Sequence, residues 1–192
     1  MKILLINDTY AVYHWGCTAT SSGISHELIN RKHKLNYIPI LDIYRFNQPP
    51  EKIPDFDDRS FFDSSSKKND NIFSKIAEAE LIMINGEGSI HRLSKTSITL
   101  LYIAYASKKY LNKTVHIINH SAYPIYDTEQ AKSATIALYK GVYKALDFIA
   151  IREHISQKIM NDLGVQSTLS FDCLPVIPPF PAQLLSRIST VH

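Results

Sequence analysis

This 192-residue sequence has no long apolar run and no closely spaced pair of cysteines. Its positive charges exceed its negative charges only slightly. No apolar run approaches the ~20 residues that a membrane-spanning helix needs. The two cysteines, Cys17 and Cys173, are far apart and predict reduced thiols rather than a disulfide framework. The 21 Lys and Arg barely exceed the 18 Asp and Glu, so nucleic acid is not predicted as a partner. The histidines are scattered, and no CxxC or HExxH motif is present, so no metal site is predicted.

The start of the chain is typical of a strand and not of a secretion signal. MKILLIN has one lysine and a short apolar stretch that leads directly into polar residues. It lacks the longer apolar region and the small-residue cleavage site of a signal peptide. Together with the reduced cysteines, this predicts a cytoplasmic protein without a transmembrane segment.

Short apolar runs alternate with helix-like stretches along most of the chain. The predicted strands are 2–6, 35–41, 81–84, 115–118, 148–151 and 168–171, and the predicted helices are 23–32, 72–79, 96–110, 127–145 and 153–163. Continuous β-rich apolar runs are typical of strands buried on both faces. The alternation therefore predicts an α/β fold, a Rossmann-like parallel sheet with helices on both faces.

Two segments depart from this alternation. Residues 47–71 contain three prolines, five aspartates and a Ser-Ser-Ser-Lys-Lys tract, which predicts a long exposed loop. Residues 175–192 begin with a proline-rich run and predict a connector or a truncated tail. Residues 1–174 then form one Rossmann-like N-terminal domain, and we expect a second domain to belong with it.

Polar segments follow four of the predicted strands, at 7–20, 85–92, 119–126 and 152–156. Ligands of open α/β sheets bind beyond the carboxyl ends of the strands, so we expect these segments to meet at one edge and to form a positively charged pocket. The candidate ligand-binding residues are Asn7, Asp8, Trp15, Gly16, Asn85, Gly86, Glu87, Gly88, Ser89, Asn119, Ser121, Glu153, Ser156 and Asp172. The candidate catalytic residues are Arg152, His91 and His120.

The segment around Gly86 and Gly88 has the strongest composition for a site, because two glycines let the backbone turn sharply and approach a ligand. Glu87 and His91 are predicted to act there as acid, base or ligand contacts. The alternative is a tight strand-to-helix turn with polar fillers. Trp15 is predicted either to stack on a sugar or nucleobase or to cover the edge of the core.

His120 and Arg152 each follow a predicted strand. The ordinary histidine pKa of ~6.5 suits His120 for proton transfer at neutral pH, and the alternative is a hydrogen-bonded loop histidine. A guanidinium at the start of a helix, as at Arg152, predicts a site for carboxylate or phosphate. The alternative is an arginine paired with neighbouring acids. Cys17 is predicted to be a small buried filler and not a nucleophile.

The order of these motifs resembles the polysaccharide pyruvyl transferase family. The likeness rests on the turn at 14–17, the Asn-Gly-Glu-Gly-Ser-Ile-His loop at 85–91 and the Arg-Glu-x-x-Ser segment at 152–156. Leu163-Gly164-Val165 and then Asp172 follow this segment. The resemblance covers most of the chain and implies the N-terminal half of a two-domain, GT-B-type fold.

The resemblance implies a transferase that moves pyruvate from phosphoenolpyruvate onto a cell-surface glycan or its precursor, without a cofactor. Such a reaction needs an acid, a cationic clamp and stabilisation of an oxocarbenium-like centre. By resemblance Arg152 is the clamp, His91 or His120 is the acid, and the backbone of 86–89 holds an anionic or sugar group. A glycan or glycolipid precursor is the expected partner, which leaves peripheral membrane association open. The alternatives are a GT-B-like glycosyltransferase with a nucleotide-sugar donor and a non-catalytic binding domain.

Overall fold

A six-stranded sheet forms the centre of the molecule. The computed structural model describes residues 1–11, 14–123 and 129–173. The strand order is β2-β1-β3-β4-β5-β6, and every neighbouring pair is parallel. The strands are β1 (Lys2–Asp8), β2 (Lys34–Pro39), β3 (Leu81–Glu87), β4 (Thr114–His120), β5 (Phe148–Ile151) and β6 (Thr168–Leu169). The helices are α1 (Trp15–Asn30), α2 (Ile40–Tyr44), α3 (Arg59–Lys68), α4 (Asp70–Glu78), α5 (Lys95–Lys109), α6 (Glu129–Ala145) and α7 (His154–Asp162), with a 3-10 turn, η1 (Ile53–Phe56).

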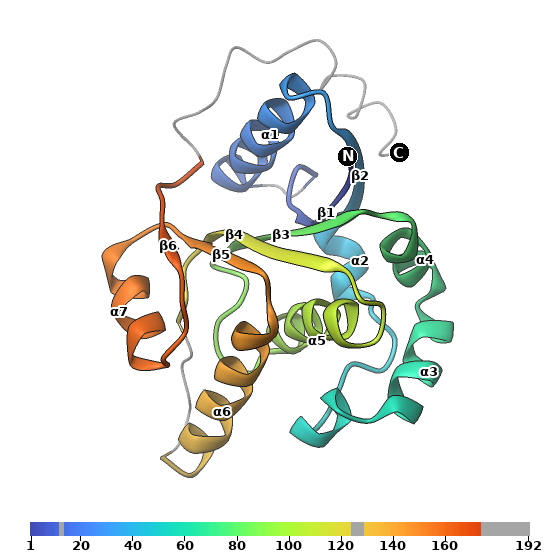
Figure 1. Ribbon diagram of the computed structural model, residues 1–192, viewed down its shortest axis with the longest axis vertical. Coiled ribbons are helices and arrows are strands. Elements are labelled where there is room, and N and C mark those ends of the chain that lie inside the picture. Colours follow the sequence, from blue (N-terminus) through green and yellow to red (C-terminus); the bar gives the residue numbers. More distant parts are fainter. Residues whose placement is uncertain (12–13, 124–128, 174–192) are drawn as a thin grey trace.

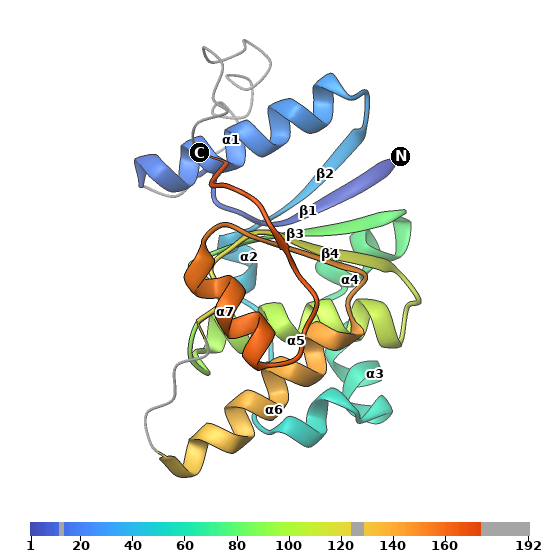
Figure 2. The same cartoon turned by 60° about the vertical axis from the view of Figure 1, so that its left-hand side comes forward.

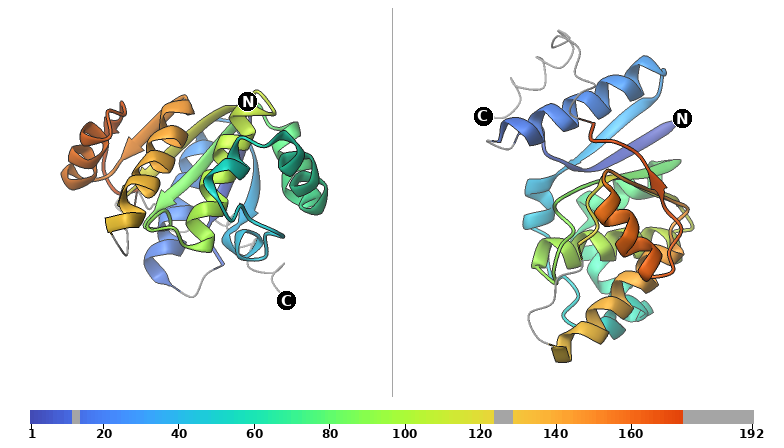
Figure 3. Two further views of the ribbon diagram at one scale, coloured as in Figure 1. Left: turned by 90° about the horizontal axis from the view of Figure 1, so that it is seen from below. Right: turned by 90° about the vertical axis from the view of Figure 1, so that its left-hand side faces the viewer.

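The helices cover the two faces of this sheet unequally. α1 lies on one face, and α2 to α6 lie on the other (Figure 1). Figure 3 shows the same division from two further directions. The larger apolar cluster includes the fully buried residues 100–104 of α5. A smaller cluster contains Ile24 of α1 together with side chains of β1 and β3. The predicted α/β fold, with a parallel sheet and helices on both faces, is confirmed.

Helix α1 begins at Trp15, well before the predicted start at Gly23. Its buried residues are small: Ala19, Thr20, Ser21, Ser22, Gly23, Ser25 and, as the one large member, Ile24. Hydroxyl groups within the helix, such as that of Thr20, donate to carbonyls one turn back, which satisfies them without water. A helix with a small, polar buried side lacks the apolar periodicity on which the prediction relied.

Residues 47–71 are not the long exposed loop that their composition predicts. They contain η1, α3 and the start of α4. Asp58 caps α3 by accepting hydrogen bonds from two N–H groups of its first turn. The buried ring of Phe62 stacks on Tyr110 with their centroids 4.6 Å apart, which fastens α3 to the core. The prediction was wrong because aspartate and serine, common in loops, are also common helix caps.

Three strands run further than the apolar runs that predicted them. β1 continues to Asp8, β3 to Glu87 and β4 to His120. The residues added at the carboxyl ends are buried, and hydrogen bonds link the side chains of Asn7, Glu87 and Asn119 to Asn85 there. β2 behaves differently, since it ends at Pro39 and the residues predicted to extend it form α2.

The later helices lie close to their predicted positions. α4, α5 and α7 begin and end within two residues of the predicted bounds. Gly164 follows α7 with a φ of 65°, as expected of the residue after a helix end. The predicted helix start at 127–128 and the predicted connector at 175–192 lie outside the described residues. Among the helices of the described ranges, none has the length and apolar character needed to cross a membrane.

Candidate functional site

The predicted meeting of polar segments at one edge of the sheet is confirmed. Figure 2 shows the strands ending on the side of the molecule where α1 and α7 begin. Backbone hydrogen bonds join the segments there: the N–H of Ser121 donates to the carbonyl of Glu87 at 2.9 Å, and that of Arg152 donates to the carbonyl of His120 at 3.1 Å. The ends of β3, β4 and β5 are therefore held in register beyond the regular ladder.

Three neighbouring strands carry a residue with left-handed backbone near their carboxyl ends. The φ angles are 62° at Asn7, 40° at Glu87 and 51° at Asn119. The strand register shifts just before the end of β1 and of β4. Such a conformation costs about 1–3 kcal/mol for a residue other than glycine. Strain of this kind is concentrated at functional sites, and here each of the three side chains is hydrogen-bonded to Asn85.

A buried amide network connects these strand ends. Nδ2 of Asn7 donates to the carbonyl of Asn85 at 2.6 Å and to Oγ of Ser89 at 3.1 Å. Nδ2 of Asn119 donates to Oδ1 of Asn85 at 3.0 Å. Asn85 in turn donates from Nδ2 to Oε1 of Glu87 at 3.0 Å. The predicted residues Asn7, Asn85, Ser89 and Asn119 are thus brought together as the support of the site. Asp8, also predicted, is buried at the end of β1.

Glu87 stands at the centre of this network. Its Oε1 also accepts a hydrogen bond from Oγ1 of Thr9 at 2.9 Å. Thr9 is itself held by Ser21 of α1, whose Oγ lies 2.9 Å from both the N–H and the Oγ1 of Thr9. Only 7% of Glu87 is exposed. The carboxylate is therefore fixed by Thr9, just after β1, and by Asn85 of β3, while Ser21 of α1 supports Thr9.

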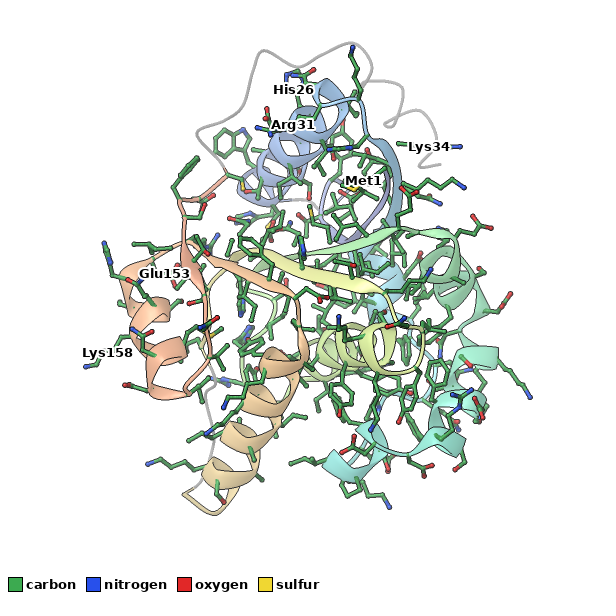
Figure 4. The ribbon with its side chains drawn as sticks, in the orientation of Figure 1. Met1, His26, Arg31, Lys34, Glu153 and Lys158 are labelled. Atoms are coloured by element: carbon green, nitrogen blue, oxygen red, sulfur yellow. The ribbon has the colours of Figure 1, made fainter. Side chains whose placement is uncertain are left out.

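Arg152 belongs to a second cluster at the start of α7, where Figure 4 labels Glu153. Its Nε donates to Oγ of Ser121 at 2.7 Å, and its Nη1 lies 2.9 Å from Oδ2 of Asp172. Ser121 donates to Oε2 of Glu153 at 3.0 Å, and the buried Ser156 bonds to the other oxygen of the same carboxylate. Arg152 is thus paired with acids, which was the alternative prediction for this residue.

A cavity of about 220 Å³ brings members of the two clusters together. It is lined by His14, Gly16, Cys17, Thr20, Glu87, Gly88, Arg152 and Asp172. Its lining carries one guanidinium and two carboxylates, so the prediction of a positively charged pocket is wrong. Within the described ranges, no three His, Cys, Asp or Glu side chains gather as they would around a metal ion.

The catalytic role predicted for His120 is contradicted by its surroundings. The side chain is fully buried, and its Nε2 is hydrogen-bonded to the hydroxyl of Tyr143 at 2.7 Å. Burial lowers the pKa of His120 to about 4, so the ring stays neutral at neutral pH. Gly86 packs directly on it, since a Cβ at Gly86 would lie 2.7 Å from Cβ of His120. The hydrogen bond of the alternative prediction is present, but His120 is the last residue of β4 and not a loop histidine.

His91 and Trp15 lie outside the cavity wall. The exposed His91 has its Nδ1 against the carbonyl of Gly88. Trp15 is the first residue of α1 and is 73% exposed, so it does not cover the core edge. Its two neighbours in the chain, His14 and Gly16, line the cavity. The stacking of Trp15 on a ligand therefore stays a prediction.

His14 and Thr20 line the cavity and were not among the predicted site residues. They reach it because α1 starts at Trp15, with His14 as its N-cap. The run of small residues at 16–23 could have predicted an earlier start of this helix, because small side chains permit close packing of a helix on a sheet. Cys17 also lines the cavity, where burial and then the charge of Glu87 raise the pKa of its thiol. The raised pKa disfavours the nucleophilic thiolate, in line with the prediction, but Cys17 is only half-buried and lines the cavity, so it is not the buried filler that was predicted.

A larger cavity of about 550 Å³ lies at the opposite end of the sheet. Its lining includes Phe148 and Thr168, the first residues of β5 and β6. Asp147 is the one ionisable residue in this lining, and it is engaged with Lys108. The smaller cavity is the better candidate site, because the strained strand ends and the buried polar network converge there.

Comparison with known proteins places the chain in a family. A family model described as polysaccharide pyruvyl transferase matches residues 6–187. No curated protein matches the chain. A solved structure, "Crystal structure of Smu.1420 from Streptococcus mutans UA159", is similar at 13% identity and a TM-score of 0.37, covering 85% of this chain and 96% of that one. This likeness is too distant to carry an argument. Because the family model spans nearly the whole sequence, the chain belongs to the polysaccharide pyruvyl transferase family.

Proposed function

We propose that this protein transfers pyruvate from phosphoenolpyruvate onto hydroxyl groups of a cell-surface glycan or its precursor. The observation that carries the proposal is the family match over residues 6–187. The cavity at the carboxyl edge supplies a place for the reacting groups, in keeping with where open α/β sheets bind ligands. The proposal requires no cofactor, and it assigns the protein to the cytoplasm, where phosphoenolpyruvate is available.

Arg152 is the residue that we assign to the donor. Its side chain is 25% exposed and forms part of the cavity wall, so an anion in the cavity can reach the guanidinium. The side chain of Asp172 is 42% exposed, and an ion pair so close to water contributes little stability. A phosphate or carboxylate group of the donor can therefore compete with Asp172 for Arg152, with the stronger bidentate geometry that such groups allow.

The test combines binding and product formation with the 192-residue chain. Isothermal titration with phosphoenolpyruvate is carried out on the wild type, on Arg152→Ala and on Arg31→Ala. Arg31 is the matched control, because it is an exposed arginine in an ion pair with Glu27 and does not line the cavity. We expect at least about tenfold weaker binding for Arg152→Ala, since a hydrogen bond to a charged group is worth about 1.5–3 kcal/mol.

Product formation is followed by mass spectrometry of an added glycan, together with release of inorganic phosphate. Binding that is equal in the wild type and Arg152→Ala would refute the assignment of Arg152. Competition by nucleoside diphosphates, with no effect of phosphoenolpyruvate, would favour a nucleotide-sugar donor instead.

A further inference from the structure

The position of Glu87 in the glycine-rich loop is unusual. Gly86 and Gly88 flank it, yet neither has a positive φ, while Glu87 has a φ of 40°. A glycine adopts such a conformation without steric cost, whereas a glutamate does not. The chain therefore places a bulky acidic side chain at the one position of this turn where glycine would relieve strain. Such strain persists where the side chain itself has a use.

The carboxylate of Glu87 is held by side chains from several segments. Oε1 accepts hydrogen bonds from Oγ1 of Thr9 at 2.9 Å and from Nδ2 of Asn85 at 3.0 Å, and the thiol of Cys17 is also hydrogen-bonded to the carboxylate. Thr9 is fixed by Ser21, and Asn85 by Asn119. Glu87 lines the cavity, and the bonds from Thr9 and Asn85 both fall on Oε1, so neither of them occupies Oε2. A carboxylate held by such a network is preorganised to accept hydrogen bonds from a ligand.

The charges of the cavity argue against an anion at this depth. In the described part of the chain, Glu87 forms no ion pair, and Arg152 is paired with Asp172. Exposure rises from 7% at Glu87 to 25% for the Arg152 side chain and 42% for that of Asp172. A phosphate beside Glu87 would face like charge in a poorly hydrated place. Hydroxyl groups would instead donate charge-assisted hydrogen bonds to the carboxylate.

The size of the cavity agrees with a single ligand fragment. Its volume of about 220 Å³ is below the ~300–1,000 Å³ of complete small-molecule sites. Thr20 and His14 add hydrogen-bonding groups to the wall. The lining therefore suits one sugar ring beside Glu87, with the anionic group of the donor at the more exposed Arg152 side, and not a whole glycan chain.

We infer that Glu87 is the anchor for a hydroxyl-bearing sugar ring of the acceptor, with its hydroxyl groups on the buried side of the cavity and the anionic donor at the Arg152 side. This inference rests on the proposed function, which requires a glycan acceptor. It makes Glu87 a specificity-determining residue: the carboxylate selects neutral hydroxyl groups and repels anions from the inner part of the cavity.

The test separates sugar binding from donor binding. Methyl glucoside, methyl galactoside and methyl mannoside are titrated by saturation-transfer NMR, and phosphoenolpyruvate by calorimetry. Glu87→Gln keeps the size of the side chain and removes its charge. Glu51→Gln, at an exposed glutamate outside the cavity, is the matched control. We expect Glu87→Gln to weaken binding of the best glycoside at least about tenfold, while its affinity for phosphoenolpyruvate is unchanged or higher.

Several outcomes would overturn the inference. These are unchanged glycoside binding in Glu87→Gln, loss of phosphoenolpyruvate binding alone, or a wild type that binds none of the glycosides. If Glu87→Gln does not fold, Thr9→Val is used in its place. This substitution removes the hydrogen bond to Oε1 of Glu87 and should weaken glycoside binding several-fold. Unchanged binding in Thr9→Val would overturn the inference. Failure of the proposed function looks different, because glycoside binding would persist without any binding or turnover of phosphoenolpyruvate.

Discussion

The packing of Gly86 on His120 leads to a quantitative prediction for Gly86→Ala. A Cβ at this position would lie 2.7 Å from Cβ and Nδ1 of His120 and 2.8 Å from its Cγ. Carbon atoms in contact are normally separated by about 3.5–4.0 Å. His120 cannot readily move, because Tyr143 holds its ring and Arg152 donates to its carbonyl. The ends of β3 and β4 must therefore separate by roughly 1 Å, given those contact distances.

Overpacking of this kind costs about 1–3 kcal/mol. For a chain of this length, each 1 kcal/mol lowers Tm by about 2–4 °C, so Tm of Gly86→Ala should fall by about 2–12 °C. The assay is thermal and urea unfolding followed by circular dichroism. Gly88→Ala is the matched control, because no atom lies within 4 Å of its added Cβ. Its stability should stay within about 0.5 kcal/mol of the wild type. Equal stability of the two variants would refute the proposed contact.

Two further predictions concern ionisable groups at the same edge. Because burial lowers the pKa of His120 from 6.5 to about 4, the unfolded chain binds a proton there before the folded chain does, and stability falls as the pH drops from 6.5 towards 4. Between pH 7.5 and 4.5 the loss from this group is about 2.5 kcal/mol, and urea unfolding at these two pH values should show it in the wild type but not in His120→Gln; parallel losses would contradict it. Removing the competing charge in Asp172→Asn should tighten phosphoenolpyruvate binding in calorimetry, whereas weaker binding would show that Asp172 orients Arg152 for the donor.

The sheet could be predicted because its strands are encoded locally. Continuous apolar runs such as 148–151 identify strands buried on both faces, and β5 has the predicted bounds. Helix α1 could not be located in the same way, since Thr20 and Ser22 on its buried side resemble loop residues. Their hydroxyls are satisfied by the helix itself, a fact visible only once the helix is placed.

The candidate site was predictable in position but not in chemistry. Parallel strands order their carboxyl ends along one edge, so Glu87 and Arg152 were expected to be near one another. The pairing of Arg152 with Asp172 depends on the path of the chain after β6, which no local pattern specifies. The burial of His120 likewise depends on contact with Gly86, from a neighbouring strand.

The central claim is that the small cavity at the carboxyl edge binds the reactants. The most direct measurement is a crystal structure of the chain soaked with phosphoenolpyruvate and the best-binding methyl glycoside. We predict density for the anion at Arg152 and for a sugar ring with hydroxyl groups on Glu87. Density for both ligands elsewhere, with this cavity holding only water, would contradict the account.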